Sequence, residues 1–260
     1  MATRAWLAHD DAGAGSAVVL IHGHPFDRAV WERQVGPLGE RFRVIAPDLR
    51  GYGHSPAVSG TATMGELALD VWGLLDDLGV ERVAAVGLSM GGLVAIEMAL
   101  ARPRSIWALG LVGTGPGEAD AVERRTRMAL ADRVEAVGMQ ALVESIGPRL
   151  LGRAADPALI ARVLAMMRAA NPVGAAAALR GRAQRPDYRA ALRELDVPAF
   201  VCAGSEDAHV TAADVEELAG ELRAASVLTI AGAGHLPNLE APRRFNDALI
   251  AFLESADGRR

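Results

Sequence analysis

The sequence predicts an α/β fold in which helices cover both faces of a mostly parallel sheet. Six short runs of apolar residues recur along the chain, and each reads as a buried strand because it lacks polar alternation. Segments with helical periodicity separate most of these runs, and such alternation is typical of a parallel sheet. The predicted strands are 17–22, 43–47, 83–87, 107–113, 199–204 and 226–231.

Four helices are predicted between and after these strands, at 63–78, 91–102, 211–222 and 242–254. Thr211 can cap the third of them, because a threonine hydroxyl accepts a hydrogen bond from the first helical turn. Pro242 suits the first turn of the fourth, where its missing N–H costs nothing.

The stretch from 116 to 190 contains only helical patterns. The predicted helices are 119–136, 139–145, 157–170 and 173–182, and Gly-Pro, Asp-Pro, Asn-Pro and Arg-Pro pairs interrupt the stretch. We therefore expect a core formed by residues 1–115 and 191–260, with residues 116–190 as a helical cap over one edge of the sheet.

Composition excludes several classes of function. The net charge of the 260 residues is −5, so no basic field attracts nucleic acid. All 27 basic residues are arginine, which excludes a lysine Schiff base, a P-loop and a Ser–Lys dyad. A single cysteine, Cys202, leaves no internal disulfide and no multi-cysteine metal site, and we expect it in the core.

The lengths of the apolar runs also indicate where in the cell the protein is expected to be found. No window approaches the length of a membrane span, and the start of the chain lacks the apolar run of a signal peptide. These features lead us to expect a cytoplasmic protein that does not contact membranes. The oligomeric state cannot be read from the sequence.

The candidate nucleophile is Ser89, in the segment Gly87-Leu88-Ser89-Met90-Gly91, which has the form G-x-S-x-G. The segment follows a predicted strand and precedes a predicted helix, and a turn there would raise Ser89 above the sheet. Such a turn is strained, and glycines on both sides relieve the crowding.

A nucleophilic serine needs a base and an acid that orients the base. Of the six histidines, His235 is favoured because it follows the last predicted strand, at the sheet edge where open α/β folds place their sites. Asp207 follows the preceding strand and is the expected acid, with Glu206 as its rival. The other histidines are His9, His22, His24, His54 and His209.

Two backbone amides are expected to form an oxyanion hole. Met90 lies between Ser89 and the predicted helix, so its amide, at the helix N-terminus, would point at the space around the serine oxygen. Gly23 would let the amide of His24 face the same space, while the His24 side chain lines the pocket and His22 is structural.

These motifs together resemble the α/β-hydrolases, from Val18 to Leu253. The matching segments are His22-Gly23-His24-Pro25, Asp48 to Ser55, Gly87 to Gly92, Asp207 and Gly234-His235. The resemblance implies the α/β-hydrolase fold with a helical cap inserted after the sixth strand, a Ser–His–Asp triad, and no cofactor or metal. The order Ser89, Asp207, His235 is the order of such a triad.

The subgroup features are mixed. The nucleophile turn and the cap segment from 171 to 189 are similar to 3-oxoadipate enol-lactonases. The loop from His22 to Phe26, together with Trp31, is similar to esterases and cofactor-free haloperoxidases (perhydrolases). A serine at the nucleophile position is unlike haloalkane dehalogenases and epoxide hydrolases.

We therefore expect a serine hydrolase that cleaves a small carboxylic ester or lactone through an acyl-enzyme on Ser89. One alternative is hydrolysis of a C–C bond, or peracid formation, by the same triad. Another is a ligand-binding protein that keeps the fold without using the triad.

The predicted cap is rich in arginine, and two interpretations stay open for it. One guanidinium can clamp a substrate carboxylate, or the set can form a solvated helix face. The arginines are Arg124, Arg125, Arg127, Arg149, Arg153, Arg162, Arg168, Arg180, Arg182, Arg185 and Arg189.

Overall fold

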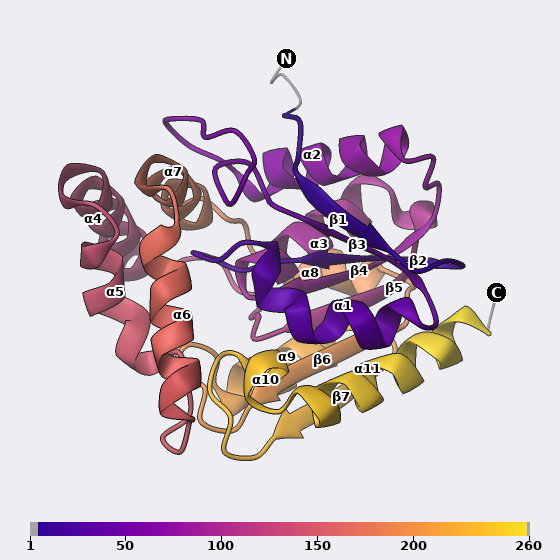
Figure 1. Ribbon diagram of the computed structural model, residues 1–260. Helices are drawn as coiled ribbons and strands as arrows, with labels where there is room; N and C mark the ends of the chain where they lie inside the picture. The colour runs from indigo at the N-terminus through magenta and orange to yellow at the C-terminus, as the bar shows by residue number, and fades with distance from the viewer. Residues whose placement is uncertain (1–4, 259–260) are drawn as a thin grey trace.

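The structure, a computed structural model, describes residues 5–258 and centres on a seven-stranded sheet (Figure 1). The strand order is β1-β3-β2-β4-β5-β6-β7; β1 pairs with β3 in antiparallel fashion, and every other neighbouring pair is parallel. The mostly parallel sheet is therefore confirmed. The strands are β1 (His9–Ala12), β2 (Ala17–Ile21), β3 (Arg43–Pro47), β4 (Val83–Leu88), β5 (Ile106–Val112), β6 (Ala199–Gly204) and β7 (Ala225–Ile230).

The two edge strands depart from the sequence prediction. β1 was not predicted, because its polar sequence His9-Asp10-Asp11-Ala12 has no apolar run. β7 was predicted to be buried, and this is wrong: Val227 is 53% exposed. As an edge strand, β7 has a single neighbour and leaves part of its surface to solvent.

Helices cover both faces of the sheet, as predicted. On one face, α1 (Glu32–Gly39) packs on β3 and α11 (Pro242–Asp257) packs on β5 and β7. On the other, α3 (Met90–Ala101) packs on β4 and β5 and also against α2 (Met64–Asp77), while α9 (Ala212–Glu221) packs on β6 and β7. The four helices predicted for the core are confirmed within a few residues; α1, α8 (Arg189–Glu194) and α10 (Pro237–Glu240) were not predicted.

The two predicted helix starts are confirmed. Thr211 is the N-cap of α9, and its hydroxyl accepts a hydrogen bond from the Asp214 amide. Pro242 is the first residue of α11.

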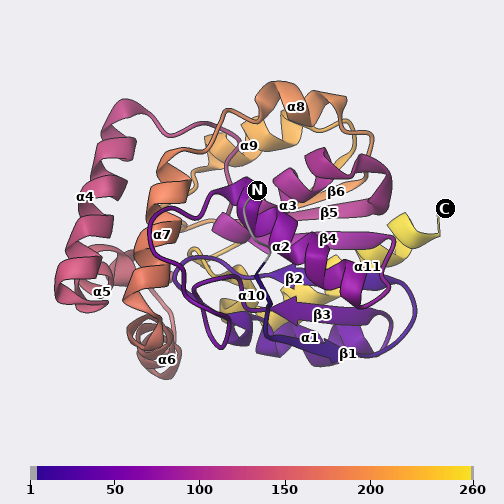
Figure 2. The same cartoon turned by 90° about the horizontal axis from the view of Figure 1, so that it is seen from above.

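Five α-helices lie between β5 and β6, and we call the first four of them the helical insertion. They are α4 (Ala121–Val137), α5 (Gln140–Ile146), α6 (Pro157–Ala169) and α7 (Pro172–Ala183), so the four helices predicted for this stretch are confirmed. Figures 1 and 2 show them together beside one end of the sheet, where α4 packs along α7. The insertion follows β5, the fifth described strand, whereas the resemblance to α/β-hydrolases implied an insertion after the sixth strand of that fold.

Two hydrophobic clusters fill the space on the two sides of the sheet. One joins α2, α3 and α9 to the sheet. The other combines Trp31 and Phe245, beneath α1 and α11, with Leu142, Met167 and Leu179 of the helical insertion. The insertion therefore shares apolar packing with the rest of the chain.

Residues 1–4 and 259–260 belong to the predicted core and lie outside the described residues. Residues 1–4 also begin the N-terminal segment that is not expected to be a signal peptide. Among the described helices, none has the length and apolar character that crossing a membrane requires.

Candidate active site

Ser89 lies in the turn between β4 and α3, with φ of 54° and ψ of −110°. It is the one non-glycine residue with positive φ among residues 5–258, and such a conformation costs about 1–3 kcal/mol. The Ser89 amide donates to the Val112 carbonyl at 2.7 Å, and the Thr114 hydroxyl donates to the Ser89 carbonyl at 3.0 Å. These bonds hold the strained turn against the end of β5.

The glycines around Ser89 are required by close backbone approaches. A Cβ on Gly87 would lie 2.1 Å from the Gly91 carbonyl oxygen, and one on Gly91 would lie 2.2 Å from the Ile21 carbonyl oxygen. Side chains at either position would therefore push α3 away from β4 and β2. This explains in physical terms why the motif flanks its serine with glycine.

His235 and Asp207 are brought together from loops that follow the last two strands. Nδ1 of His235 lies 2.8 Å from Oδ2 of Asp207. A carboxylate only accepts hydrogen bonds, so Nδ1 carries the proton and Nε2 keeps its lone pair. The His235 amide donates to the Leu150 carbonyl at 2.9 Å, which ties this loop to the segment that follows α5.

Asp207 is held as a buried carboxylate. Its side chain has no exposed surface, and Oδ1 accepts from the amides of His209 and Val210 at 2.7 and 3.1 Å. Burial raises the pKa of Asp207, but the hydrogen bond and charge of His235 and the two amides outweigh it and lower the pKa below its usual value. The anion therefore persists at neutral pH.

Two backbone amides beside Ser89 lack an acceptor. Among the backbone hydrogen bonds of residues 5–258, none involves the amide of His24 or of Met90. A Cβ on Gly23 would lie 3.3 Å from Cβ of Ser89, so the loop carrying His24 runs directly against the serine. Both amides are therefore available as donors on this side of the sheet.

Several of these residues line one pocket, which has a volume of about 500 Å³. Its lining includes Ser89, His235 and His24, together with side chains from α4, α7 and the segment after α5. The volume falls within the range of small-molecule sites.

The sequence was compared with models of known protein families. The alpha/beta hydrolase family model matches residues 18–248. The chain belongs to the α/β-hydrolase family.

Several relatives of this α/β-hydrolase are enzymes that act on esters or lactones. It is 28% identical to 3-oxoadipate enol-lactonase 1 of Acinetobacter baylyi, over 92% of this chain and 89% of the enol-lactonase. A thermophilic esterase from Thermogutta terrifontis, in a malate-bound structure, is 36% identical with a TM-score of 0.94, covering 97% of this chain and 94% of the esterase. The enol-lactonase from Burkholderia xenovorans LB400 is 30% identical with a TM-score of 0.87, covering 96% and 97%.

The remaining histidines of the hydrolase have other surroundings. His22 is fully buried, and its Nε2 accepts from the Leu49 amide at 2.9 Å, which suits a structural role. His209 lines the pocket, with its ring 5.0 Å from that of His235. Burial, followed by the charge of His235, lowers the pKa of His209 to about 4, so its ring is neutral at pH 7. His9 and His54 do not line this pocket.

The Glu206 carboxylate and the Cys202 thiol do not line the pocket. Glu206 accepts from the amide and the guanidinium of Arg153 at 2.8 and 2.9 Å, and it does not line the pocket. Cys202 is buried within β6, as expected, and burial raises the pKa of its thiol to about 12. Neither group competes with Asp207 or Ser89.

Sequence reasoning did not single out two features of the pocket. The hydroxyl of Tyr52 lies 2.6 Å from Nδ1 of His24. Some of the cap arginines also line the pocket. Helical spacing alone does not predict which ones, because the answer depends on how α4 and α7 pack against each other. Those that line it are Arg127, Arg149, Arg182, Arg185 and Arg189.

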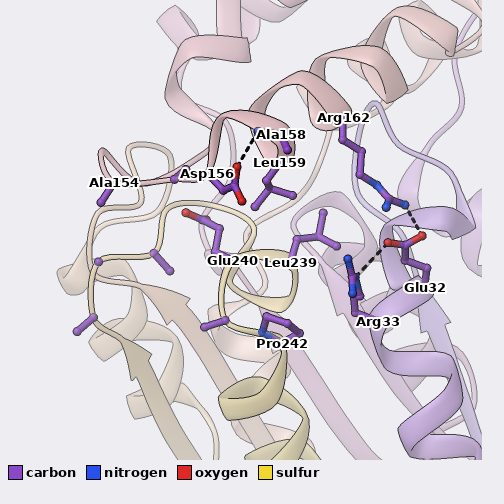
Figure 3. Close-up of a pocket in the computed structure, with 15 residues that line it drawn as sticks. Glu32, Arg33, Ala154, Asp156, Ala158, Leu159, Arg162, Leu239, Glu240 and Pro242 are labelled. Atoms are coloured by element: carbon purple, nitrogen blue, oxygen red, sulfur yellow. Dashed lines mark hydrogen bonds and ion pairs between the residues drawn. The ribbon is translucent and has the colours of Figure 1, made fainter.

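A second hollow, of about 720 Å³, lies between the start of α6 and the start of α11 (Figure 3). Several of its charged side chains already have partners. Glu32 forms ion pairs with Arg33 and Arg162, and the Asp156 carboxylate accepts a hydrogen bond from the Ala158 amide at 2.8 Å. It contains neither serine nor histidine. Within the described part of the chain, no group of three His, Cys, Asp or Glu side chains is arranged to hold a metal ion.

Proposed function

We propose that this α/β-hydrolase cleaves a small carboxylic ester or lactone through an acyl-enzyme on Ser89. The observation that carries the proposal is the 2.8 Å contact between Nδ1 of His235 and Oδ2 of Asp207 in the wall of the pocket that Ser89 lines. The enol-lactonase and esterase relatives support the same class of substrate.

The first half of the reaction forms the acyl-enzyme. Oγ of Ser89 attacks the substrate carbonyl carbon while Nε2 of His235 takes its proton. The buried Asp207 anion keeps Nδ1 protonated and stabilises the imidazolium. The amides of His24 and Met90 donate to the oxyanion, and each such donor is worth roughly a hundred- to a thousand-fold in rate.

Collapse of the first tetrahedral intermediate breaks the bond between the carbonyl carbon and the alcohol oxygen, which takes the proton from His235, and this step completes the acyl-enzyme. The second half releases the acid, and it begins when His235 takes a proton from a water that attacks the acyl carbon. Collapse of the second tetrahedral intermediate returns the proton to Oγ of Ser89. For a lactone the alcohol and the acid belong to one molecule, so ring opening gives a single hydroxy acid.

The helical insertion has a role in this proposal. Residues 116–190 act as a cap, and residues 1–115 and 191–260 act as the core that carries Ser89, Asp207 and His235. Leu142 and Leu179 of the insertion line the pocket together with Ser89 and His235, and their side chains restrict its size. A small substrate follows from that restriction.

The test compares the wild-type protein with Ser89→Ala on short p-nitrophenyl esters and on an enol-lactone. Ser89→Ala should reduce kcat by about 10⁵- to 10⁶-fold, because the nucleophile is lost. Ser226→Ala, on the exposed edge strand β7, is the matched control and should behave as wild type. A fluorophosphonate probe should add its mass to Ser89 in the wild-type protein and not in Ser89→Ala.

Other outcomes have different meanings. Turnover of esters by a folded Ser89→Ala protein would contradict the acyl-enzyme. Turnover of a vinylogous diketone, or peroxide-dependent peracid formation, without ester or lactone hydrolysis would assign the triad to other chemistry. No reaction with substrates or probe would indicate a ligand-binding protein.

A further inference from the structure

Three guanidinium groups converge on the pocket beside Ser89. Arg127 lies on α4, Arg182 near the end of α7 and Arg185 just after it, and all three line the pocket. We call them the arginine cluster. Burial lowers the pKa of Arg127 and of Arg182, and the like charges of neighbouring arginines in the cluster lower both further.

The cluster has too few counter-ions among the described residues. Glu123 pairs with Arg127 and with Arg185, so one carboxylate serves both. The side chain of Arg182 has no ion pair and no hydrogen bond in the described part of the chain. The other acidic side chains of the pocket have partners of their own: Glu118 with Arg124, Asp214 with Thr211 and Glu217 with Arg189.

Several donor atoms of this pocket are buried without an acceptor. Among residues 5–258 these are Nε of Arg182, Nη1 of Arg127, Nη1 of Arg185 and Nε2 of His24. A buried charged donor left without a partner costs more free energy than a neutral one. The pocket therefore contains a set of donors that a ligand can satisfy.

His24 belongs to this set as a neutral donor. Burial, followed by the charges of Arg182 and Arg127, lowers the pKa of His24 well below its usual value. The Tyr52 hydroxyl lies 2.6 Å from Nδ1 of His24. In the tautomer in which this hydroxyl donates to Nδ1, the proton is on Nε2 and every free atom of the set is an N–H group.

Arg182 is positioned by close contact between α7 and the core. The Ala62 amide donates to the Ala177 carbonyl at 3.0 Å. A Cβ on Gly181, the residue before Arg182, would lie 1.7 Å from the Ala62 carbonyl oxygen. This approach is possible only with glycine, and it sets Arg182 at a defined place in the pocket wall.

Burial, with Arg127 and Arg185 nearby, lowers the pKa of Arg182 to about 9. The guanidinium is therefore still charged at pH 7, but at a cost that an anion would offset. Anions that match the planar fork of a guanidinium are carboxylates, which accept two parallel hydrogen bonds.

We propose that the arginine cluster, centred on Arg182, is a subsite that binds a carboxylate of the substrate while Ser89 attacks a separate ester or lactone carbonyl. The inference rests on the proposed hydrolase function and narrows its substrate to a carboxylated small ester or lactone. Arg182 binds the carboxylate in bidentate fashion, Nη1 of Arg127 or Arg185 adds a further donor, and the pocket volume of about 500 Å³ keeps the molecule small.

The test uses two substrates that differ in one charge. Mono-p-nitrophenyl glutarate has a free carboxylate, and methyl p-nitrophenyl glutarate has the same chain with that carboxylate esterified. Arg182→Gln should lower kcat/KM for the anionic ester about ten- to a hundred-fold, mainly through KM, because a charge-assisted pair is lost. The neutral ester should change less than about threefold, so the ratio of the two rates falls.

Two variants control this comparison. Arg180→Gln changes an arginine on the same helix that pairs with Asp132 and Glu135 and does not line the pocket, and it should leave the ratio as in wild type. Arg182→Lys keeps the charge without the fork and should fall between wild type and Arg182→Gln. Removing a like charge from the cluster should leave Arg182→Gln folded, which circular dichroism checks.

A binding measurement separates this inference from the hydrolase proposal. Calorimetry of glutarate with the Ser89→Ala protein should show binding that Arg182→Gln weakens at least about tenfold. If wild type hydrolyses both esters and Arg182→Gln leaves their ratio unchanged, the subsite is refuted and the hydrolase stands. If neither ester reacts but glutarate binds through Arg182, the hydrolase fails and the subsite stands; with neither reaction nor binding, both fail.

Discussion

Glu206 and Asp207 are adjacent in the chain, yet their carboxylates serve different parts of the molecule. Glu206 accepts from Arg153 at the surface, while Asp207 accepts from His235 with no exposed surface of its own. The difference arises because Asp207 turns inward and takes the amides of His209 and Val210. The two residues therefore provide a matched pair of variants.

Asp207→Asn should lower kcat by roughly 10⁴-fold, because the amide no longer fixes the His235 tautomer or stabilises its cation. Glu206→Gln removes an exposed ion pair and should change stability by less than about 1 kcal/mol and leave kcat as in wild type. Initial rates on a p-nitrophenyl ester measure both. Equal losses in the two variants would argue against the role assigned to Asp207.

Ser89→Gly should be more stable than Ser89→Ala by about 1 kcal/mol. Glycine relieves the positive-φ strain of about 1–3 kcal/mol, while its greater unfolded-state entropy returns roughly 0.5–1 kcal/mol. Alanine keeps the strain, and both variants lack the Ser89 hydroxyl. Urea denaturation of the two proteins measures the difference, and a more stable alanine variant would show that the turn is not strained.

The stability of the protein should fall as the pH drops below about 6.5, partly because of His22. Burial lowers the pKa of His22 below its usual value, and a proton on Nε2 would face the Leu49 amide that donates to it. The unfolded chain therefore binds more protons than the folded protein between the usual pKa and the lowered one. Stability from this group is complete above that window and decreases through it.

Urea denaturation of wild type and His22→Gln at pH 7.5 and pH 5.0 tests this. The glutamine amide oxygen can accept from Leu49 without titrating, so the variant should lose less stability between the two pH values. His24 and His209 act in the same direction in both proteins, so the comparison isolates His22. An identical pH dependence would remove His22 from the explanation.

Asp70→Asn should lower the free energy of unfolding by about 3–5 kcal/mol, because it removes the counter-charge of a buried ion pair. Asp70, 1% exposed, accepts from Nε and Nη2 of Arg50 at 2.5 and 2.6 Å. The exposed pair Arg41–Glu254 is the control, and Glu254→Gln should cost less than about 1 kcal/mol. Similar costs in urea denaturation would show that the Arg50–Asp70 pair is not effectively buried.

Much of the fold could be predicted because its signals are local. Apolar runs predict the central strands, and Thr211 and Pro242 begin their helices as expected. The edge strands were predicted poorly, because β1 has no apolar run and β7 has one without being buried. Burial at an edge depends on which strand lies beside it, and that information is not local.

The sequence by itself determined where a strained serine turn can occur, since glycine spacing and the strand-to-helix transition are properties of neighbouring residues. It also determined that no lysine ammonium can bind an anion in this protein, so a permanently charged cationic side chain at such a site must be arginine. Only the tertiary structure decided that Asp207 rather than Glu206 meets His235, and that Arg182 lies in the pocket while Arg180, on the same helix, lies outside it. Those choices depend on contacts between segments far apart in the chain, and packing of α7 against the core selects the face that lines the pocket.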